Sequence, residues 1–431
     1  MRRVHRAWWI AGITFATLIA SAAFRSTTGV LLEPIEAEFG WTRSLTSAAV
    51  SLNLLLYGLT APFAASLMER FSLRRVVAAA LALVALGSAA TLVMTQSWQL
   101  VVAWGIFVGF GCGALALVFG AIVANRWFSS RRGLVTGIFS SAYATGQLIF
   151  LPAFARLATD SGWRWASACV GLLAAALIVP VLAFLRDRPS EVGLLPYGAP
   201  APGGKAETEP GPALPSTARG TLLVLRDAAR TMPFWILAGT FFVCGWSTNG
   251  LIGTHFIPAA HDHGMPVVMA ASLLALVGVF DFFGTIASGW LSDKVDSVWL
   301  LFAYYGLRGL ALFSAPLLLG PDVQPPLLFF IVFYGLDWVA TVPPTVQLCR
   351  KYFGLSRSGV VYGWVFASHM VGAAISASYA GAIRQSQGSY TIAWITAASL
   401  CLVAALSVLA LRRMVPSGSV ISKRPSLSTG T

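Results

Sequence analysis

The sequence contains few charged residues. Only 10% of its 431 residues are Asp, Glu, Lys or Arg, whereas 57% are hydrophobic. Soluble proteins typically carry about 25% charged residues. The shortage of charge excludes water as the main solvent of this chain and predicts a membrane protein.

Motifs that define enzymes and cofactor sites are also lacking. The five cysteines lie far apart and none is spaced as a metal-ligand or redox pair, so we interpret them as packing residues. The sequence contains no Walker motif and no catalytic constellation. We therefore expect neither an enzyme nor a cofactor or metal site, and we interpret His261-Asp262-His263 as an exposed loop rather than a metal site.

Long apolar stretches are present instead. A helix needs about 20 apolar residues to cross a bilayer, and the first stretch that qualifies is too long for a signal-peptide core, so we expect it to remain in the mature protein. The predicted spans are 8–32, 45–67, 76–95, 98–124, 133–155, 164–185, 234–259, 268–291, 298–319, 327–348, 360–383 and 390–411. This pattern predicts an all-α membrane protein with twelve transmembrane helices.

The net charge of +13 reflects topology rather than binding of nucleic acid. With a cytoplasmic N-terminus, 23 of the 29 Lys and Arg residues fall in cytoplasmic segments, whereas the reverse orientation breaks the positive-inside rule. We therefore expect a multi-pass protein of the cytoplasmic (inner) membrane with both termini in the cytoplasm. We expect it to be monomeric, with the lipid bilayer as its surroundings.

One long polar segment separates two sets of six spans. Residues 187–231 contain seven prolines and lack apolar periodicity, which is typical of a linker. The expected parts are an N-terminal six-helix bundle (1–186), a cytoplasmic linker (187–231), a C-terminal six-helix bundle (232–413) and a cytoplasmic tail (414–431).

The loops of the two sets resemble each other at offsets of 224 to 226 residues. The matching segments are Ala65–Arg70 with Gly289–Lys294, Arg126–Gly133 with Lys351–Arg357, and Gly162 with Gly388. Parallel six-helix repeats of this kind form transporters whose substrate site lies at mid-depth between the halves.

Four charged residues lie in the interior of predicted spans, namely Arg25, Asp281, Arg308 and Asp337. A charge at the centre of a spanning helix costs about 2.5–3.5 kcal/mol, so four such charges indicate a function. Arg binds a carboxylate through two parallel hydrogen bonds and stays protonated, which makes Arg25 and Arg308 candidate substrate-binding residues. Asp can bind and release a proton as its neighbours change, which makes Asp281 and Asp337 candidate proton-coupling residues.

Each charge also has a structural interpretation. Arg25 could be an anchor that reaches the outer membrane interface, and Asp281 could form a static pair with Arg308. For Arg308 and Asp337 we favour an ion pair that fixes helix packing inside one half.

Uncharged polar residues at mid-depth complete the candidate substrate site. Asn249 in span seven could donate a hydrogen bond to substrate or to a neighbouring helix. His369 in span eleven is either functional or a satisfied packing residue. Tyr143 could shape an apolar cavity, although aromatic residues at such positions are more often packing residues.

The repeated loops Ala65–Arg70 and Gly289–Lys294 resemble those of the major facilitator superfamily, and the resemblance covers residues 7–413. It implies two pseudo-symmetric six-helix bundles and a cytoplasmic latch, or gating loop, formed by Glu69, Arg70, Asp293 and Lys294. The N-terminal copy departs from the family, with Ser72 where a turn glycine is usual, and this implies a weaker latch there.

Three passages resemble the monocarboxylate-porter and oxalate/formate-antiporter branch of that superfamily. They are Phe24–Ser26 with Glu33–Ser44, Asn125–Gly137, and Val279–Asp281. The resemblance implies that Arg25 and Asp281 couple proton and carboxylate movement. The family's Arg four residues after this Asp is Thr285 here, and Arg308 is a candidate replacement.

The sequence therefore predicts a secondary transporter that moves a small organic anion, most simply a monocarboxylate, with protons or in exchange for a second anion. An efflux pump for apolar or amphiphilic compounds is the alternative, indicated by the many aromatic residues and by Thr285. A non-transporting membrane receptor is disfavoured because no soluble domain is appended.

Overall fold

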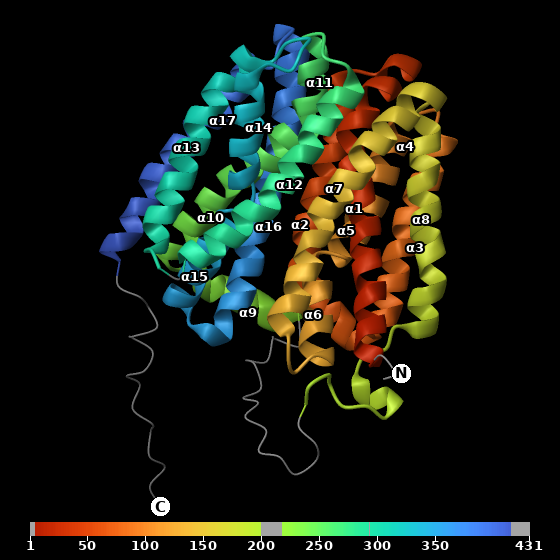
Figure 1. The fold of residues 1–431 in the computed structure, drawn as a ribbon, viewed down its shortest axis with the longest axis vertical. Helices are drawn as coiled ribbons and strands as arrows, with labels where there is room; N and C mark the ends of the chain where they lie inside the picture. The colour runs from red at the N-terminus through yellow and green to blue at the C-terminus, as the bar shows by residue number, and fades with distance from the viewer. Residues whose placement is uncertain (1–4, 200–217, 293, 415–431) are drawn as a thin grey trace, which may run out of the picture.

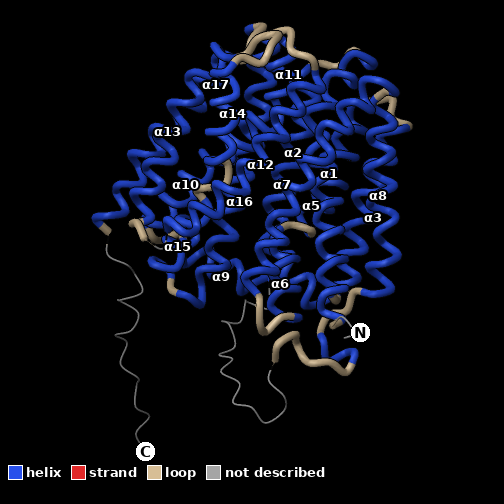
Figure 2. Tube along the Cα trace, in the orientation of Figure 1, coloured by secondary structure: helices blue, strands red, loops and turns tan. Residues whose placement is uncertain are grey.

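The computed structural model describes residues 5–199, 218–292 and 294–414. These residues form helices and turns (Figure 2). One isolated bridge joins Phe128 and Tyr197. The side chains of some helical residues, among them Arg25, Glu69 and Tyr143, also lie outside the described part, as does the whole of Asp293.

The N-terminal half contains six spans, and its fourth span is built from several pieces. Its elements are α1 (Arg6–Phe39), α2 (Arg43–Phe71), α3 (Leu73–Leu92), α4 (Ser97–Leu100), the π-helical η1 (Val101–Val108), α5 (Gly109–Ala114), α6 (Leu117–Trp127), α7 (Arg132–Ser161) and α8 (Trp163–Phe184). The short η2 (Pro189–Val192) and α9 (Ala218–Ala228) follow in the predicted linker.

The C-terminal half also contains six spans, of which the first and the fourth are built from several pieces. Its elements are α10 (Met232–Gly245), the π-helical η3 (Trp246–Ile252), α11 (Gly253–Asp262), α12 (Val267–Ser292), α13 (Ser297–Leu318), α14 (Pro325–Asp337), α15 (Val342–Phe353), α16 (Leu355–Gln387), α17 (Thr391–Val408) and η4 (Leu409–Arg413).

Eleven helical segments of the described residues are long and apolar enough to cross a membrane. The remaining predicted span lies in α7, which is 30 residues long and has many side chains outside the described part. The two halves stand side by side, and α1 begins at the end of the molecule where η4 ends (Figure 1). The predicted all-α class with two helical bundles is confirmed.

Glycine ends several spans because the chain must reverse sharply there. Gly40 closes α1 with a φ of 66°, and Gly388 closes α16 with a φ of 71° while its N–H donates to the carbonyl of Arg384. Residues with a Cβ rarely adopt this left-handed conformation, and glycine does so without strain.

The two halves meet most extensively along two pairs of helices, in which α2 packs on α16 and α7 packs on α12. Small residues let the first pair approach closely. Gly58 of α2 lies against Met370 of α16, and the hydroxyl oxygens of Ser51 and Ser378 are 2.7 Å apart.

The last part of the predicted linker is helical. Residues 218–228 form α9, which packs against α16 and α2. Thr221 and Ala228 are buried, and the carbonyl of Thr221 accepts a hydrogen bond from Trp364 Nε1 at 3.2 Å. The many prolines before residue 218 concealed this short amphipathic helix.

Candidate functional site

The span predicted at 327–348 is two helices rather than one. Helix α14 ends at Asp337, and α15 begins at Val342 with Pro343 and Pro344 in its first turn. Proline has no N–H to donate and cannot continue an α-helix from its N-terminal side. The break at 338–341, here called the span-ten break, therefore leaves backbone groups without helical partners in the middle of a span.

Side chains from the two preceding spans bind the carbonyl groups at this break. Ser288 of α12 donates to the carbonyl of Ala340 at 2.5 Å. In a continuous helix this carbonyl would accept from the N–H of residue 344, which is a proline and has none. Arg308 of α13 donates through Nη2 to the carbonyls of Asp337 at 2.5 Å and Trp338 at 3.3 Å. In a bilayer core each unsatisfied backbone group costs several kcal/mol, so these contacts stabilise the break.

Asp281 binds an amide group at the same break. Its Oδ1 accepts hydrogen bonds from the N–H of Val339 at 3.1 Å and from the hydroxyl of Thr285 at 3.0 Å. Asp281 is buried. Thr285, which stands where the resemblance expects Arg, is thus a neutral hydrogen-bond donor to the carboxylate.

Arg308 and Asp337 form an ion pair within the C-terminal half. Arg308 Nε lies 2.6 Å from Asp337 Oδ2, and the exposed fractions of the two side chains are 0% and 6%. The rings of Tyr305 and Tyr334 face the guanidinium at 5.8 and 5.9 Å. The structural interpretation of Arg308 and Asp337 matches this geometry, whereas the pair of Asp281 with Arg308 is not formed within the described residues.

The same arginine reaches the wide turn of span seven, which is η3. Its Nη1 lies 3.1 Å from Cys244 Sγ and 3.4 Å from Ser247 Oγ. Tyr334 donates to the carbonyl of Ser247 at 2.8 Å, and Cys244 Sγ is 3.3 Å from the hydroxyl of Thr341. A π-helical turn exposes backbone carbonyls, and such turns are frequent at functional sites.

Asn249 and His369 lie against each other between spans seven and eleven. Asn249 Nδ2 is 3.2 Å from His369 Nε2. The imidazole is packed between Phe241, at a centroid distance of 4.8 Å, and Phe366, at 5.7 Å, and Tyr57 of the other half contacts Phe366. These contacts bring two predicted substrate-binding residues together beside an aromatic cluster.

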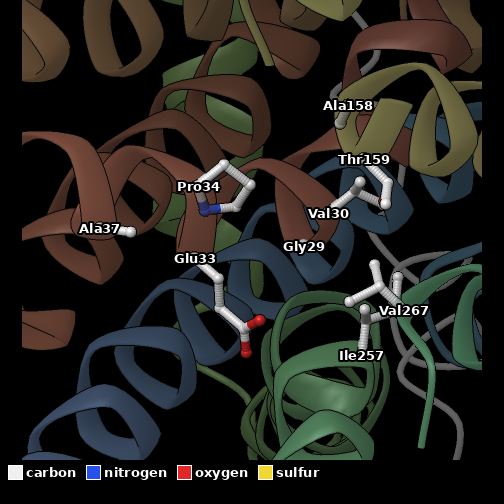
Figure 3. Close-up of a pocket in the computed structure, with 9 residues that line it drawn as sticks. All are labelled: Gly29, Val30, Glu33, Pro34, Ala37, Ala158, Thr159, Ile257 and Val267. Carbon is white, nitrogen blue, oxygen red and sulfur yellow. The ribbon is translucent and has the colours of Figure 1, made fainter. Parts of the chain in front are cut away.

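At the end of the molecule away from Arg6 and Arg413, here called the distal end, a pocket of about 200 Å³ lies between the halves (Figure 3). It is lined by Gly29, Val30, Glu33, Pro34 and Ala37 of α1, Ala158 and Thr159 of α7, Ile257 of α11 and Val267 of α12. Figure 3 shows the side chain of Glu33 extending from α1 toward the C-terminal half. The lining is apolar except for this carboxylate and the hydroxyl of Thr159.

Polar contacts join the halves at the distal end. His261 Nδ1 of α11 lies 2.6 Å from Glu33 Oε2, and Arg43 Nη1 of α2 lies 3.4 Å from the hydroxyl of Tyr390. That hydroxyl is 3.2 Å from Nδ1 of the buried His255. Arg43 also contacts Glu33 at 3.7 Å in its own half. His261 belongs to the end of a helix and not to a loop, although it is exposed as predicted.

Of the predicted latch residues, the structure describes Arg70 and Lys294 with their side chains, and these two lie at the opposite end. Arg70 and Lys294 are exposed, and Lys294 Nζ lies 3.9 Å from the ring centroid of Trp290. Asp293 and the side chain of Glu69 lie outside the described residues. Ser72 adopts a φ of 73°, so this serine holds a positive φ, for which glycine is usual.

The predicted residues thus form two clusters. Asn249 meets His369, while Arg308, Asp337 and Asp281 converge on the span-ten break; the side chains of Arg25 and Tyr143 lie outside the described part. Sequence reasoning missed Ser288, Cys244, Tyr334, Glu33 and Arg43. Only Pro343-Pro344 signalled the break in the sequence. The side chains that bind its backbone groups come from other spans and follow no sequence motif.

Comparisons with known proteins agree with this architecture. A sequence model of the Major Facilitator Superfamily matches residues 13–377. Over 383 residues the chain is 27% identical to the uncharacterized MFS-type transporter YcxA of Bacillus subtilis (strain 168), which covers 87% of this chain and 88% of that protein. Over 425 residues it is 26% identical to monocarboxylate transporter 11 of Homo sapiens, which covers 95% of this chain and 84% of that protein.

Among solved structures, the chain is similar to a bacterial homologue of the human lysosomal transporter Spinster, crystallised in an inward-facing and unoccupied conformation. The TM-score is 0.72 at 14% identity, over 95% of this chain and 97% of that one. At this identity the likeness concerns the fold alone.

Proposed function

The chain belongs to the major facilitator superfamily, and from that premise we propose that this membrane transporter moves a small organic anion, most simply a monocarboxylate, together with protons or in exchange for a second anion. The similarity to monocarboxylate transporter 11 over 95% of the chain supports the substrate class.

The observation that carries the proposal is the environment of Asp281. Its carboxylate is buried in the middle of a span and binds neutral donors, Thr285 and the N–H of Val339, while the nearby Arg308 is paired with Asp337. A buried carboxylate with neutral partners is able to take up a proton, since protonation breaks no ion pair. We therefore assign proton coupling to Asp281, with Asp337 as the second candidate.

We place the substrate between the halves, beside Asn249 and His369. An amide and an imidazole are both able to donate hydrogen bonds to a carboxylate, and the aromatic rings of Phe241, Phe366 and Tyr57 would contact its apolar part. Arg25 of α1 is the cation that the family resemblance assigns to the carboxylate.

The distal end then acts as one gate of an alternating-access cycle. The Lys and Arg distribution favours a protein of the inner membrane with both chain ends in the cytoplasm. In that orientation this gate faces outward. Its contacts, Glu33 with His261 and Arg43 with Tyr390, would then hold the outer side closed.

A screen of small carboxylates for thermal stabilisation of the purified protein tests the substrate class, followed by uptake of each stabilising compound into proteoliposomes. We expect at least one monocarboxylate to raise the melting temperature and to be taken up under an inward proton gradient. Arg25→Ala should lose this binding, since truncating one partner of a buried Arg–carboxylate contact costs about 2–5 kcal/mol.

The aromatic cluster and Thr285 favour a second candidate, the efflux of apolar or amphiphilic compounds. If Arg25→Ala binds and transports the carboxylate like the wild-type protein, or if amphiphiles alone stabilise the protein, the anion proposal fails and the efflux proposal replaces it. Arg25→Lys provides the control, because it keeps the charge but not the planar fork and should retain weakened transport.

A further inference from the structure

We infer that Arg308 and Asp337 are positioning residues, which hold the span-ten break against the wide turn of span seven and thereby set where Asn249 meets His369. The inference rests on the proposed function, in which Asn249 and His369 belong to the substrate site.

The contacts of Arg308 connect the two irregular spans directly. Its Nε and Nη2 bind the side chain of Asp337 and the carbonyls of the break, while its Nη1 faces Cys244 and Ser247 of span seven. Ser247 lies two residues before Asn249 within η3. A shift of Arg308 therefore moves the turn that carries Asn249.

Arg308 has no donor left for a substrate. All three guanidinium nitrogens have protein partners, and the side chain is 0% exposed. The planar fork matters, because one ammonium cannot contact a carboxylate, two backbone carbonyls and the turn of span seven at these separate positions.

The N-terminal half serves as an internal comparison. Span four also breaks, between Ala114 of α5 and Leu117 of α6, which is about 225 residues before the span-ten break and thus at the repeat-related place. At the same offset, the position that corresponds to Arg308 is Leu83, and the position that corresponds to Asp337 is Cys112. Since neutral residues suffice there, the fold itself does not require the ion pair.

Stability alone is also a poor explanation for the pair. A buried ion pair often contributes nothing compared with apolar residues of similar size, because both charges lose their hydration. Here Asp337 Oδ1 has no hydrogen-bond partner among the described residues, so the compensation is incomplete. The pair is better explained by the geometry that it imposes on span seven.

An engineered zinc site with two histidines can measure the relative position of residues 249 and 369. Asn249→His places an imidazole Nδ1 where Asn249 Nδ2 now lies, 3.2 Å from His369 Nε2. Two nitrogens bound to a tetrahedral Zn²⁺ at about 2.0–2.1 Å are about 3.3 Å apart. Zn²⁺ affinity, measured by titration of purified Asn249→His, therefore reports the relative position of spans seven and eleven.

The double substitution Arg308→Gln with Asp337→Asn is introduced into the Asn249→His protein. We expect it to lower Zn²⁺ affinity by about tenfold or more, as is usual when groups that orient a metal ligand are lost. Arg308→Lys should give a smaller loss. Neutralising the exposed pair of Glu38 and Arg164, whose N–O distance is also 2.6 Å, is the matched control and should leave affinity unchanged. Asn249→His with His369→Gln measures background binding by the other histidines.

Unchanged Zn²⁺ affinity in a double variant that is folded and monodisperse would overturn the inference. If the double variant does not fold, Arg308→Lys in the Asn249→His protein takes its place, and an unchanged Zn²⁺ affinity in that variant would overturn the inference. Because zinc binding requires no transport, a failure here leaves the anion proposal standing, and a transporter that exports amphiphiles instead would still pass this test.

Discussion

Asp281 and Arg308 both bind backbone groups that have lost their helical partners. Asp281 accepts from the N–H of Val339, and Arg308 donates to the carbonyls of Asp337 and Trp338. Charges are costly within a membrane, yet unsatisfied backbone groups are costly as well. Asp281 and Arg308 therefore have a structural task, which for Asp281 comes in addition to the proton coupling that we propose.

Asp281→Asn should abolish proton-driven accumulation of the transported carboxylate while preserving exchange of one anion for another. The asparagine oxygen is still able to accept from Val339 and Thr285, so the span-ten break should stay intact, but the side chain no longer binds a proton at physiological pH. Accumulation and counterflow, measured in the same proteoliposomes, separate the two activities.

The control for this substitution is Thr285→Val, which removes a hydrogen bond of about 1 kcal/mol and keeps the carboxyl group. It should accumulate substrate with altered kinetics. If Asp281→Asn accumulates substrate as the wild-type protein does, the proton site lies elsewhere and Asp337 is the next residue to test.

At the level of helices, hydropathy located the spans but not their interruptions. The predicted span 327–348 covers most of α14 and α15, and 234–259 runs through α10, η3 and α11 without distinction. Apolar composition indicates that a segment lies in the membrane. It has the same value whether the segment is one continuous helix or a helix that is interrupted and capped. Pro343-Pro344 was a visible signal, whereas we found none for η3, whose Ser247 contacts Arg308 and Tyr334 from other spans.

Close approach of helices is a second feature that sequence alone did not assign to particular residues. Gly245→Ala should destabilise the protein, since a Cβ there would overlap the carbonyl oxygen of His369, and overpacking typically costs about 1–3 kcal/mol. Gly239 lies on the same helix, where a Cβ would meet nothing within 4 Å. Gly239→Ala is therefore the matched control and should be neutral or slightly stabilising.

Thermal unfolding of both variants in detergent checks this expectation. A Gly245→Ala protein as stable as Gly239→Ala would mean that α10 and α16 separate easily. Because His369 also contacts Asn249, we further expect Gly245→Ala, but not Gly239→Ala, to weaken binding of the carboxylate.

For the molecule as a whole, the repeats predicted two bundles, and the structure agrees. The orientation in the membrane stays a prediction from the Lys and Arg distribution. Lys205→Cys, in the predicted cytoplasmic linker, should resist a membrane-impermeant maleimide added to intact cells and should react after permeabilisation. Efficient labelling of intact cells would reverse the orientation and turn the distal gate toward the cytoplasm.

Transport by alternating access requires the halves to separate at the distal end, where α2 and α16 touch through Ser51 and Ser378. Their hydroxyl oxygens are 2.7 Å apart, which is compatible with the Cβ separation of about 3.5–4.5 Å that a disulfide needs. Ser51→Cys with Ser378→Cys should therefore oxidise readily, and the cross-link should stop uptake, which reduction restores. Each single substitution should transport with or without oxidant, because none of the five native cysteines forms a disulfide within the described residues and four of them are buried. Complete cross-linking is judged by a mobility shift after cleavage between the halves. If the fully cross-linked protein transports at the wild-type rate, α2 and α16 stay together during the cycle. The moving contacts would then have to be those of α1 with α11, where Glu33 meets His261.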